Sequence, residues 1–213
     1  MKSTKEKMSY CIGLQTARQL KNQFAEVDVT LLEKGFCDVL RDVHLMLEES
    51  EIEALLTNLQ KQIQQQQKAQ IQHISEENKK QAEEIFNKNK EDPSIHVLPS
   101  GLQYRVLQKG AEGQKKPTSF DAVSIHYRGT DLNGRVFDSS YQRGEPLQIP
   151  LARVIPGWSE VLQLMTPGDK WQVFIPSYLA YGEMGFGAQI SPNMALVFEM
   201  ELLEILQDRG MDG

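Results

Sequence analysis

The sequence lacks long apolar runs and contains few aromatic residues. Of its 213 residues, 40% are hydrophobic and 8% are aromatic. No window approaches the roughly 18 uninterrupted apolar residues of a membrane-spanning helix, so we expect no membrane span. Residues 1–15 also lack the apolar stretch of an export signal. We therefore expect the chain as given to be cytoplasmic, or periplasmic or at the cell surface if a signal was removed.

Basic residues are fewer than acidic ones. The chain has 23 Lys and Arg residues against 29 Asp and Glu residues, and its formal net charge is −6. The basic residues are scattered along the chain, whereas proteins that bind nucleic acids gather them into a patch that contacts phosphates. We expect no nucleic-acid partner.

Cysteine is limited to Cys11 and Cys37. Each stands among apolar residues at helical spacing, with no CxxC motif and no His at the spacing of a metal ligand. We predict that both are small buried core residues. A disulfide between them, which an exported protein could form, is the alternative.

Motifs for cofactor, metal or covalent chemistry are missing as well. The four histidines are dispersed, and the sequence contains no HExxH, no phosphate-binding Walker loop and no GxGxxG. No His stands in a recognisable motif with a reactive Ser or Cys. We expect no cofactor and no metal. Any activity must then proceed without a cofactor or a covalent intermediate, and rotation about an amide bond is a reaction of this kind.

The first 60 residues show helical periodicity. Apolar residues fall on one helical face over 8–25, and Thr30 followed by Glu33 predicts a capping box that opens a second helix. Ser50 with Glu53 predicts the start of a third helix. We predict an all-α domain over residues 1–60.

The third helix is expected to continue far beyond that domain. From Gln60 to Phe86 there is no Gly and no Pro, and good helix formers dominate. A helix from Glu51 to Lys90 would extend about 60 Å. Between 64 and 84 it offers few apolar residues, so we predict a solvated connecting helix over 61–92; a disordered Gln-rich linker is the alternative.

After Pro93 the pattern changes to period two, which is typical of half-buried antiparallel strands. One short helical pattern begins at Pro156-Gly157 and closes at Pro167-Gly168. We predict an α+β fold in which an antiparallel sheet over 93–213 wraps around one short helix. The alternating apolar residues are Leu102, Tyr104 and Val106, then Val123, Ile125 and Tyr127, then Trp171, Val173 and Ile175, and finally Leu196, Phe198, Met200 and Leu202.

A series of motifs in this half resembles FKBP-type peptidyl-prolyl cis/trans isomerases, in order and spacing. The matching runs are VSIHYRG from Val123, GRVFDSS from Gly134, VIPGW from Val154, IPSYLAYG from Ile175 and ALVFE from Ala195. The helical arm followed by LPSGLQY from Leu98 resembles the bacterial macrophage infectivity potentiator (Mip) subgroup of this family.

This resemblance implies an aromatic pocket for a prolyl ring. The family's catalytic groups correspond to Asp138 in the pocket wall, the Ile155 backbone N–H and the Tyr181 hydroxyl. The implied substrate-binding residues are Tyr127, Phe137, Leu147, Val154, Ile155, Trp158, Tyr181, Ile190 and Phe198.

The resemblance also implies partners: proline-containing polypeptide clients, a second copy of the chain bound through the N-terminal helices, and the macrolide inhibitors of the family. Leu147 stands where the family often has an aromatic residue, and Phe186 and Gln189 occupy its variable loop. We expect these departures to leave proline binding intact. They affect tight macrolide binding and the preference for the residue before proline, both of which the rim and the loop set.

The residues allow rival interpretations. Taken singly, Phe137, Trp158 and Phe198 are what the core of a small sheet-and-helix domain needs, and Asp138 suits a turn. For the function, we expect an active isomerase that assists folding and has chaperone activity. The alternative is a non-catalytic holdase or adhesion module that uses the proline pocket only for binding.

Overall fold

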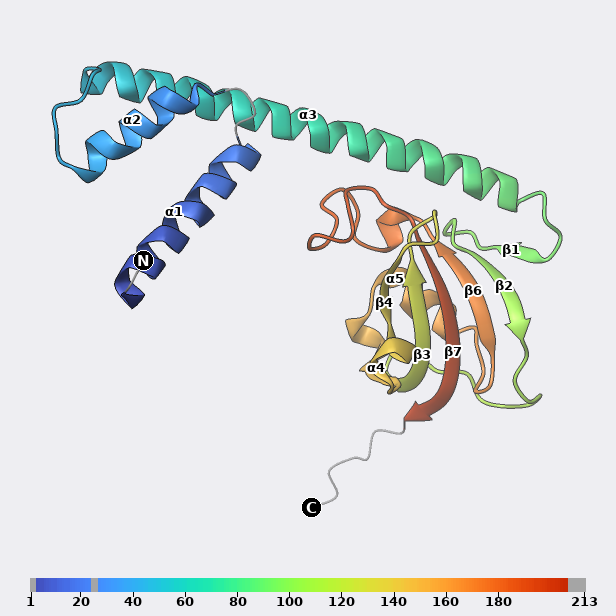
Figure 1. The fold of residues 1–213 in the computed structure, drawn as a ribbon. Helices are drawn as coiled ribbons and strands as arrows, with labels where there is room; N and C mark the ends of the chain where they lie inside the picture. Colours follow the sequence, from blue (N-terminus) through green and yellow to red (C-terminus); the bar gives the residue numbers. More distant parts are fainter. Residues whose placement is uncertain (1–2, 24–26, 207–213) are drawn as a thin grey trace. The chain divides into compact units, whose positions relative to one another are not determined.

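The computed structural model describes residues 3–23 and 27–206, which form two compact units, Met1–Gln62 and Ile63–Gly213 (Figure 1). The predicted α+β fold is confirmed, with helices in the first unit and an antiparallel sheet in the second. No helix in the described ranges is both long and apolar enough to cross a membrane. The units are treated separately below.

The first unit contains α1 (Thr4–Gln23), α2 (Val29–Leu40) and the start of α3 (Glu49–Asn89). A capping box opens α1: the Glu6 N–H donates to Ser3 Oγ at 3.2 Å, and the Ser3 N–H donates to Glu6 Oε2 at 3.3 Å. The helix therefore begins at Thr4, four residues before the apolar pattern that starts at Met8.

The predicted starts of the next two helices need correction. Asp28, not Thr30, caps α2, because Asp28 Oδ1 accepts from the Thr30 N–H at 2.9 Å and from the Leu31 N–H at 3.1 Å. Asp is at least as good an N-cap as Thr, and the Asp28 carboxylate satisfies two N–H groups of the first helical turn. The third helix begins at Glu49, which precedes the Ser50 predicted to open it.

No described side chain in residues 3–21 and 27–62 is buried. The prediction that both cysteines are buried is therefore wrong for the single chain: Cys11 is exposed, Cys37 is half-buried, and both are free thiols. Their apolar neighbours remain exposed or only half-buried in the part of the unit that the structure describes.

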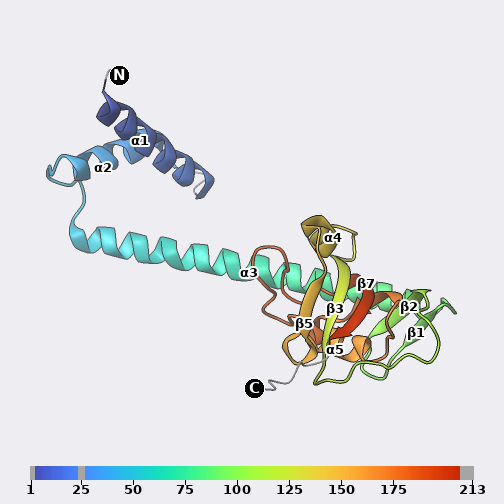
Figure 2. The same cartoon turned by 90° about the horizontal axis from the view of Figure 1, so that it is seen from below.

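The predicted long helix is present, as α3 continues without a break for 41 residues (Figure 2). Its second part does more than bridge solvent. Within the second unit, the Asn78 side chain bonds to Ser191 and Pro192, and the Gln81 side chain bonds to Asn133. These contacts use amide side chains, which apolar periodicity does not reveal. The predicted boundaries of 60 and 92 remain predictions.

The second unit is built on one seven-stranded antiparallel sheet in the order β1-β2-β6-β7-β3-β4, with β5 paired to β3 (Figure 1). Its strands are β1 (Ile95–Val97), β2 (Gln103–Gln108), β3 (Ala122–Thr130), β4 (Val136–Ser139), β5 (Leu147–Pro150), β6 (Lys170–Ile175) and β7 (Leu196–Leu206). The predicted strands correspond to β2, β3, β6 and β7.

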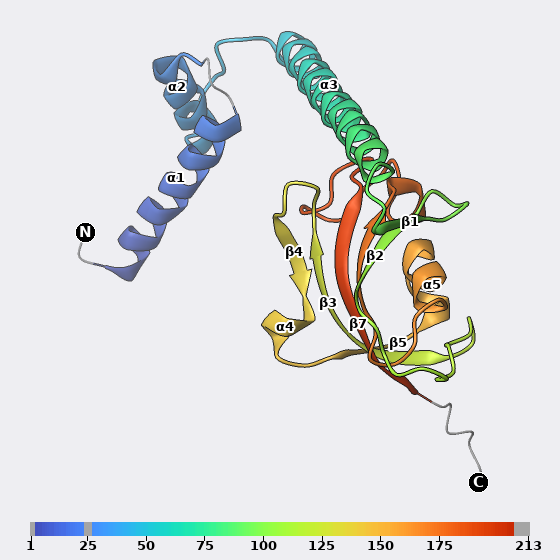
Figure 3. The same ribbon diagram turned by 90° about the vertical axis from the view of Figure 1, so that its right-hand side faces the viewer.

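The core lies between the sheet and α5 (Pro156–Leu162), which Figure 3 shows against one sheet face. Pro156 stands at the start of α5, where its missing N–H leaves no helical bond unmade. Gly157 allows close packing, because a Cβ there would lie 2.5 Å from Ile175 Cγ2. Trp158, Val161 and Leu162 then point into the apolar core, as the helical pattern predicts.

Short elements connect this framework. The helix α4 (Ser140–Arg143) follows β4, and 3-10 turns span Leu151–Arg153 and Ser177–Leu179. Sequence analysis did not predict these elements or β1, β4 and β5, because three or four residues are too few to establish a period.

Candidate functional site

A cavity of about 290 Å³ opens between α5, β3, β4, β5 and the segment around Tyr181. Nearly all the residues that the sequence predicts for the site line it. The lining residues are Tyr127, Phe137, Asp138, Leu147, Ile149, Arg153, Val154, Ile155, Trp158, Tyr181 and Phe198.

Aromatic rings form the inner surface of the cavity. The Trp158 ring meets Tyr127 edge to face with centroids 4.8 Å apart and meets Phe198 in the same way at 5.1 Å. Phe137 stands at 90° to Phe198, with centroids 5.7 Å apart. Such edge-to-face pairs hold each other in place, so the cavity wall is rigid as well as apolar.

Gly129 on β3 permits this arrangement. A Cβ at this position would lie 2.7 Å from Phe198 Cε1 and 2.8 Å from Phe137 Cε2. Real Cβ contacts are essentially never that short, so any larger residue would displace the two rings. The glycine is required for close approach and not for a turn.

Asp138 is the acidic residue on the cavity lining, and both of its carboxylate oxygens accept hydrogen bonds. Its Oδ2 accepts from the Tyr127 hydroxyl at 2.5 Å, and its Oδ1 accepts from Arg143 Nη1. Arg143 Nη2 also donates to the Tyr127 hydroxyl at 2.8 Å, and the guanidinium carbon lies 5.4 Å from the Tyr127 ring centroid. The carboxylate thus fixes the ring of Tyr127 and is itself fixed by Arg143.

The tyrosines at the cavity stay protonated near neutral pH. Burial raises the pKa of the Tyr127 hydroxyl, and the hydrogen bond to Asp138 raises it further. Burial also raises the pKa of Tyr181, with a smaller contribution from the negative charge of Asp138. Both hydroxyls therefore keep their protons, and can donate hydrogen bonds, at neutral pH.

Two of the predicted orienting groups have donors available. In the part of the chain that the structure describes, neither the Tyr181 hydroxyl nor the Ile155 backbone N–H has a hydrogen-bond partner. Both residues line the cavity and are partly exposed. A donor that is partly shielded from water and unpaired is suited to bind a carbonyl oxygen of a ligand.

Ile190 is the predicted residue that the structure does not place on the cavity lining. Its side chain is buried in the core, and its backbone pairs with Phe186 across the loop that follows Tyr181. The ring of Phe186 stacks on Tyr181 with centroids 5.0 Å apart. Gln189 is exposed in the same loop, and its carbonyl accepts from Arg135 at 3.4 Å.

The sequence analysis did not single out Ile149, Arg153 or Arg143. Ile149 alternates with Leu147 on β5, a period-two signal that would have identified both as one face of a strand. Arg143 lies five residues after Asp138, and the turn of α4 brings the two together. No periodic pattern indicates such a pair.

The chain belongs to the FKBP-type peptidyl-prolyl cis-trans isomerases. Residues 113–203 match the family described by that name, and residues 5–106 match the domain amino-terminal to FKBP-type peptidyl-prolyl isomerase. The chain is accordingly a peptidyl-prolyl isomerase of the Mip-like kind, as its motifs predict.

Its relatives share both units. The outer membrane protein MIP of Legionella longbeachae is 38% identical, over 94% of this chain and 85% of that protein. The FKBP-type 22 kDa isomerase of Escherichia coli is 42% identical, over 93% of this chain and 94% of its own. The crystal structure of FkpA from Escherichia coli matches with a TM-score of 0.76 and 32% identity, and it covers 96% of this chain and 98% of FkpA.

Proposed function

We propose that this isomerase acts on X-Pro bonds in unfolded or partly folded protein clients and binds the prolyl ring in the cavity floored by Trp158. The observation that carries this proposal is the composition of the cavity. Edge-to-face aromatic rings surround it, and its acidic residue, Asp138, is already paired with Arg143. Such a site can accept an apolar ring and offers no nucleophile to attack it.

Rotation about an X-Pro bond is slow because it breaks the resonance of the amide. X-Pro rotation has a barrier near ~20 kcal/mol and takes tens of seconds or more without a catalyst. Twisting the bond removes its resonance and reduces its charge separation. An apolar cavity therefore disfavours the planar ground state more than the twisted transition state, which is differential binding without an acid or a base.

The polar groups orient the substrate in this proposal. The free donors of Ile155 and Tyr181 bind substrate carbonyl oxygens, the Tyr181 hydroxyl taking the one beside the proline. Asp138 shapes the wall by holding Tyr127. Because Arg143 neutralises Asp138, the carboxylate contributes position and not a proton transfer.

A protease-coupled peptide with one X-Pro bond tests activity against the holdase alternative. Acceleration beyond the thermal rate is expected for the full-length chain. Binding of the peptide without acceleration would favour the holdase or adhesion module.

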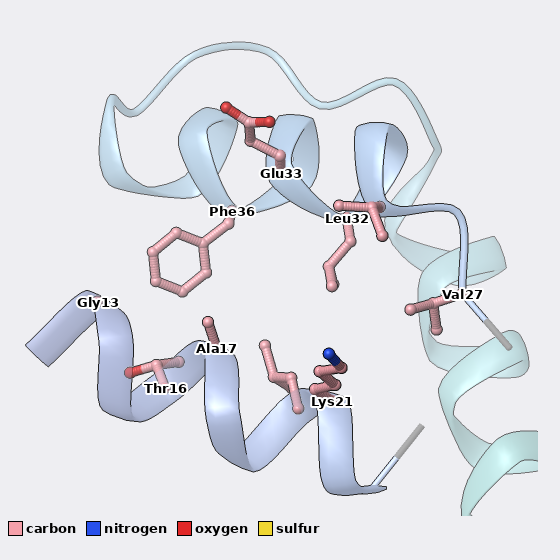
Figure 4. Close-up of a pocket in the computed structure, with 10 residues that line it drawn as sticks. Gly13, Thr16, Ala17, Lys21, Val27, Leu32, Glu33 and Phe36 are labelled. Carbon is pink, nitrogen blue, oxygen red and sulfur yellow. The ribbon is translucent and has the colours of Figure 1, made fainter. Parts of the chain in front are cut away.

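We also propose that the first unit forms a homodimer. It exposes apolar side chains that a soluble monomer would normally cover, and an apolar groove of about 410 Å³ opens between α1 and α2 (Figure 4). Ala17 and Leu20 line it from α1, and Leu32 and Phe36 line it from α2. The match of residues 5–106 to the family's amino-terminal domain supports the same role.

For the shared core of the dimer we propose apolar residues that are exposed in the single chain. Met8 is 60% exposed, Ile12 63% and Leu40 70%, while Leu14 and Phe36 are also exposed. The sixth residue that we propose for the shared core, Phe24, lies outside the described residues. The mass of the full chain in solution at micromolar concentration tests the proposal, and a monomer would contradict it.

Two linked catalytic units would also support chaperone activity, since a client bound at one unit meets the second at a raised effective concentration. Refolding of a protein limited by proline isomerisation, compared with the turnover of a short peptide, measures this contribution. Macrolide binding remains a proposal as well, with Leu147 on the cavity lining predicting weaker binding.

For the compartment, the name of the Legionella relative, an outer membrane protein, favours the periplasm or the cell surface over the cytoplasm. Fractionation of cells that express the natural gene tests this preference.

A further inference from the structure

The loop from Gly182 to Ala195 carries one wall of the cavity by way of Tyr181. Its tip is closed on itself: the Phe186 N–H donates to the Ile190 carbonyl at 2.7 Å, and the Ile190 N–H donates to the Phe186 carbonyl at 3.2 Å. Gly185 has a φ of 65° and lies so close to this pair that a Cβ would be 2.2 Å from the Ile190 oxygen. The tip is therefore compact, and the stacked ring of Phe186 connects it to Tyr181.

The base of the same loop is tied to α3. Asn78 Nδ2 donates to the Pro192 carbonyl at 2.8 Å and to Ser191 Oγ at 2.9 Å. The next residue of the loop, Asn193, donates from its Nδ2 to Ser75 Oγ at 2.7 Å. One turn of the helix thus binds three consecutive loop residues with directional bonds.

Asn193 joins this attachment to the start of the loop. It is buried, has a φ of 55°, and its backbone N–H donates to the Gly182 carbonyl at 2.8 Å. Gly182 directly follows Tyr181. A shift of Asn193 would therefore move the backbone that adjoins Tyr181 as well as the loop that packs on its ring.

We propose that the α3 turn formed by Ser75 and Asn78 positions the active-site loop and thereby sets the placement of Tyr181 and the preference for the residue before proline. This inference rests on the role proposed above for Tyr181. Ser75 and Asn78 are positioning residues, since they act through Ser191, Pro192 and Asn193 and do not line the cavity. The rival explanation is that the same bonds only anchor the helix.

Gln81 provides a matched control on the same helix. Its Nε2 donates to Asn133 Oδ1 at 2.7 Å, a bond of the same kind that leads to the turn between β3 and β4. That turn has its own support, because Asp131 Oδ1 accepts from the N–H groups of Asn133 and Arg135, both at 2.9 Å. Loss of the Gln81 bond weakens the docking of the helix without releasing the loop.

The experiment compares full-length Asn78→Ala and Gln81→Ala on two short peptides that differ only in the residue before proline, Leu or Glu, well below the unfolding temperature. We expect Asn78→Ala to lower kcat/KM for the Leu-Pro peptide by about 3- to 10-fold and to change the ratio between the peptides by about 3-fold or more, since small misplacements of orienting groups reduce rates strongly. Gln81→Ala should stay within about twofold of the parent, as one peripheral hydrogen bond contributes little.

A second pair of variants tests the bond itself. Asn193→Gly accepts the positive φ and removes the side-chain donor, while Ser75→Ala removes the acceptor. The loss in the double variant should equal that of either single variant, because both remove one interaction. Unchanged rates and ratio in Asn78→Ala, or the same change in Gln81→Ala, would overturn the proposal. No turnover of either peptide by the parent chain would instead refute the proposed isomerase site.

Discussion

The two units differ most in how many of their apolar side chains each buries within the single chain. In the second unit, the sheet and α5 enclose Val123, Ile125, Val161, Leu162 and their neighbours with no measurable exposure. In the first unit no described side chain is buried, although α2 carries the apolar residues Leu31, Leu32, Phe36, Val39 and Leu40. A single chain therefore buries a core in its second unit, whereas the proposed homodimer would cover the exposed apolar side chains of the helical unit.

The largest effect is expected from Trp158→Ala. Removing a buried aromatic side chain leaves a cavity and should lower the free energy of unfolding of the second unit by about 3–5 kcal/mol. Turnover should fall as well, because the floor of the cavity is lost. Thermal unfolding with a peptide assay measures both, and normal turnover in a destabilised variant would return Trp158 to a purely structural role.

A charge in the helical unit should come next. Leu40 is 70% exposed in the single chain, so Leu40→Glu would be nearly neutral in a monomer. If Leu40 is buried between two copies, the variant should dissociate at concentrations where the parent is dimeric. Phe120→Glu is the matched control, since Phe120 is 94% exposed in the second unit and should change nothing. Sedimentation of both variants and the parent measures which of them are dimers. A dimeric Leu40→Glu variant would contradict the burial of Leu40 between two copies.

Separating the units should alter protein refolding more than peptide turnover. A fragment of residues 63–213 keeps the bonds from Ser75 and Asn78 to the loop, so we expect a folded monomer that turns over short peptides at close to the full-length rate. Its activity on a refolding protein should be several-fold weaker, roughly in proportion to the lost effective concentration. Equal losses in both assays would mean that the helical unit acts on the pocket itself.

Substitution of the orienting groups should have a moderate effect. Asp138→Leu releases Tyr127 and leaves Arg143 unpaired, and we expect kcat/KM to fall about tenfold. Tyr181→Phe removes one donor and should cost about as much as one hydrogen bond to substrate, a few-fold. Circular dichroism should show the fold intact, and unchanged kcat/KM in both variants would remove these residues from the site.

The smallest effect concerns pH. Because the pKa values of Tyr127 and Tyr181 are raised in the folded chain, these groups contribute stability that is fully present below the unfolded value of about 10 and is lost as pH rises through the folded value. Turnover attributable to them should be flat from about pH 6 to 9. A decline between pH 7 and 9 that Tyr181→Phe abolishes would contradict the assigned protonation.

Sequence periodicity predicted the long elements, and the resemblance to the FKBP family implied the residues of the cavity. Val123, Ile125 and Tyr127 alternate clearly enough to define β3, and Trp158 follows a Pro-Gly signal at the start of α5. The capping signals were less decisive, since Asp28 and Thr30 compete for one helix start and only geometry selects Asp28.

The remaining features depend on contacts between residues that are distant in sequence. Asn78 and Gln81 look like solvated helix residues, and nothing in their neighbourhood indicates Pro192 or Asn133 as partners. Arg143 was missed for a related reason, because it pairs through a short turn. Polar side chains that dock one element on another leave no periodic trace.

Gly129 has a consequence for how the cavity can vary. The distance between the rings of Phe137 and Phe198 is set by a position that bears no side chain and that the substrate need not touch. The width of the cavity therefore depends on a residue that lies behind the rings and not on its lining. An engineer who wanted a narrower or skewed site could begin with Gly129→Ala, which pushes the rings forward while leaving every hydrogen-bonding group of the cavity in the sequence.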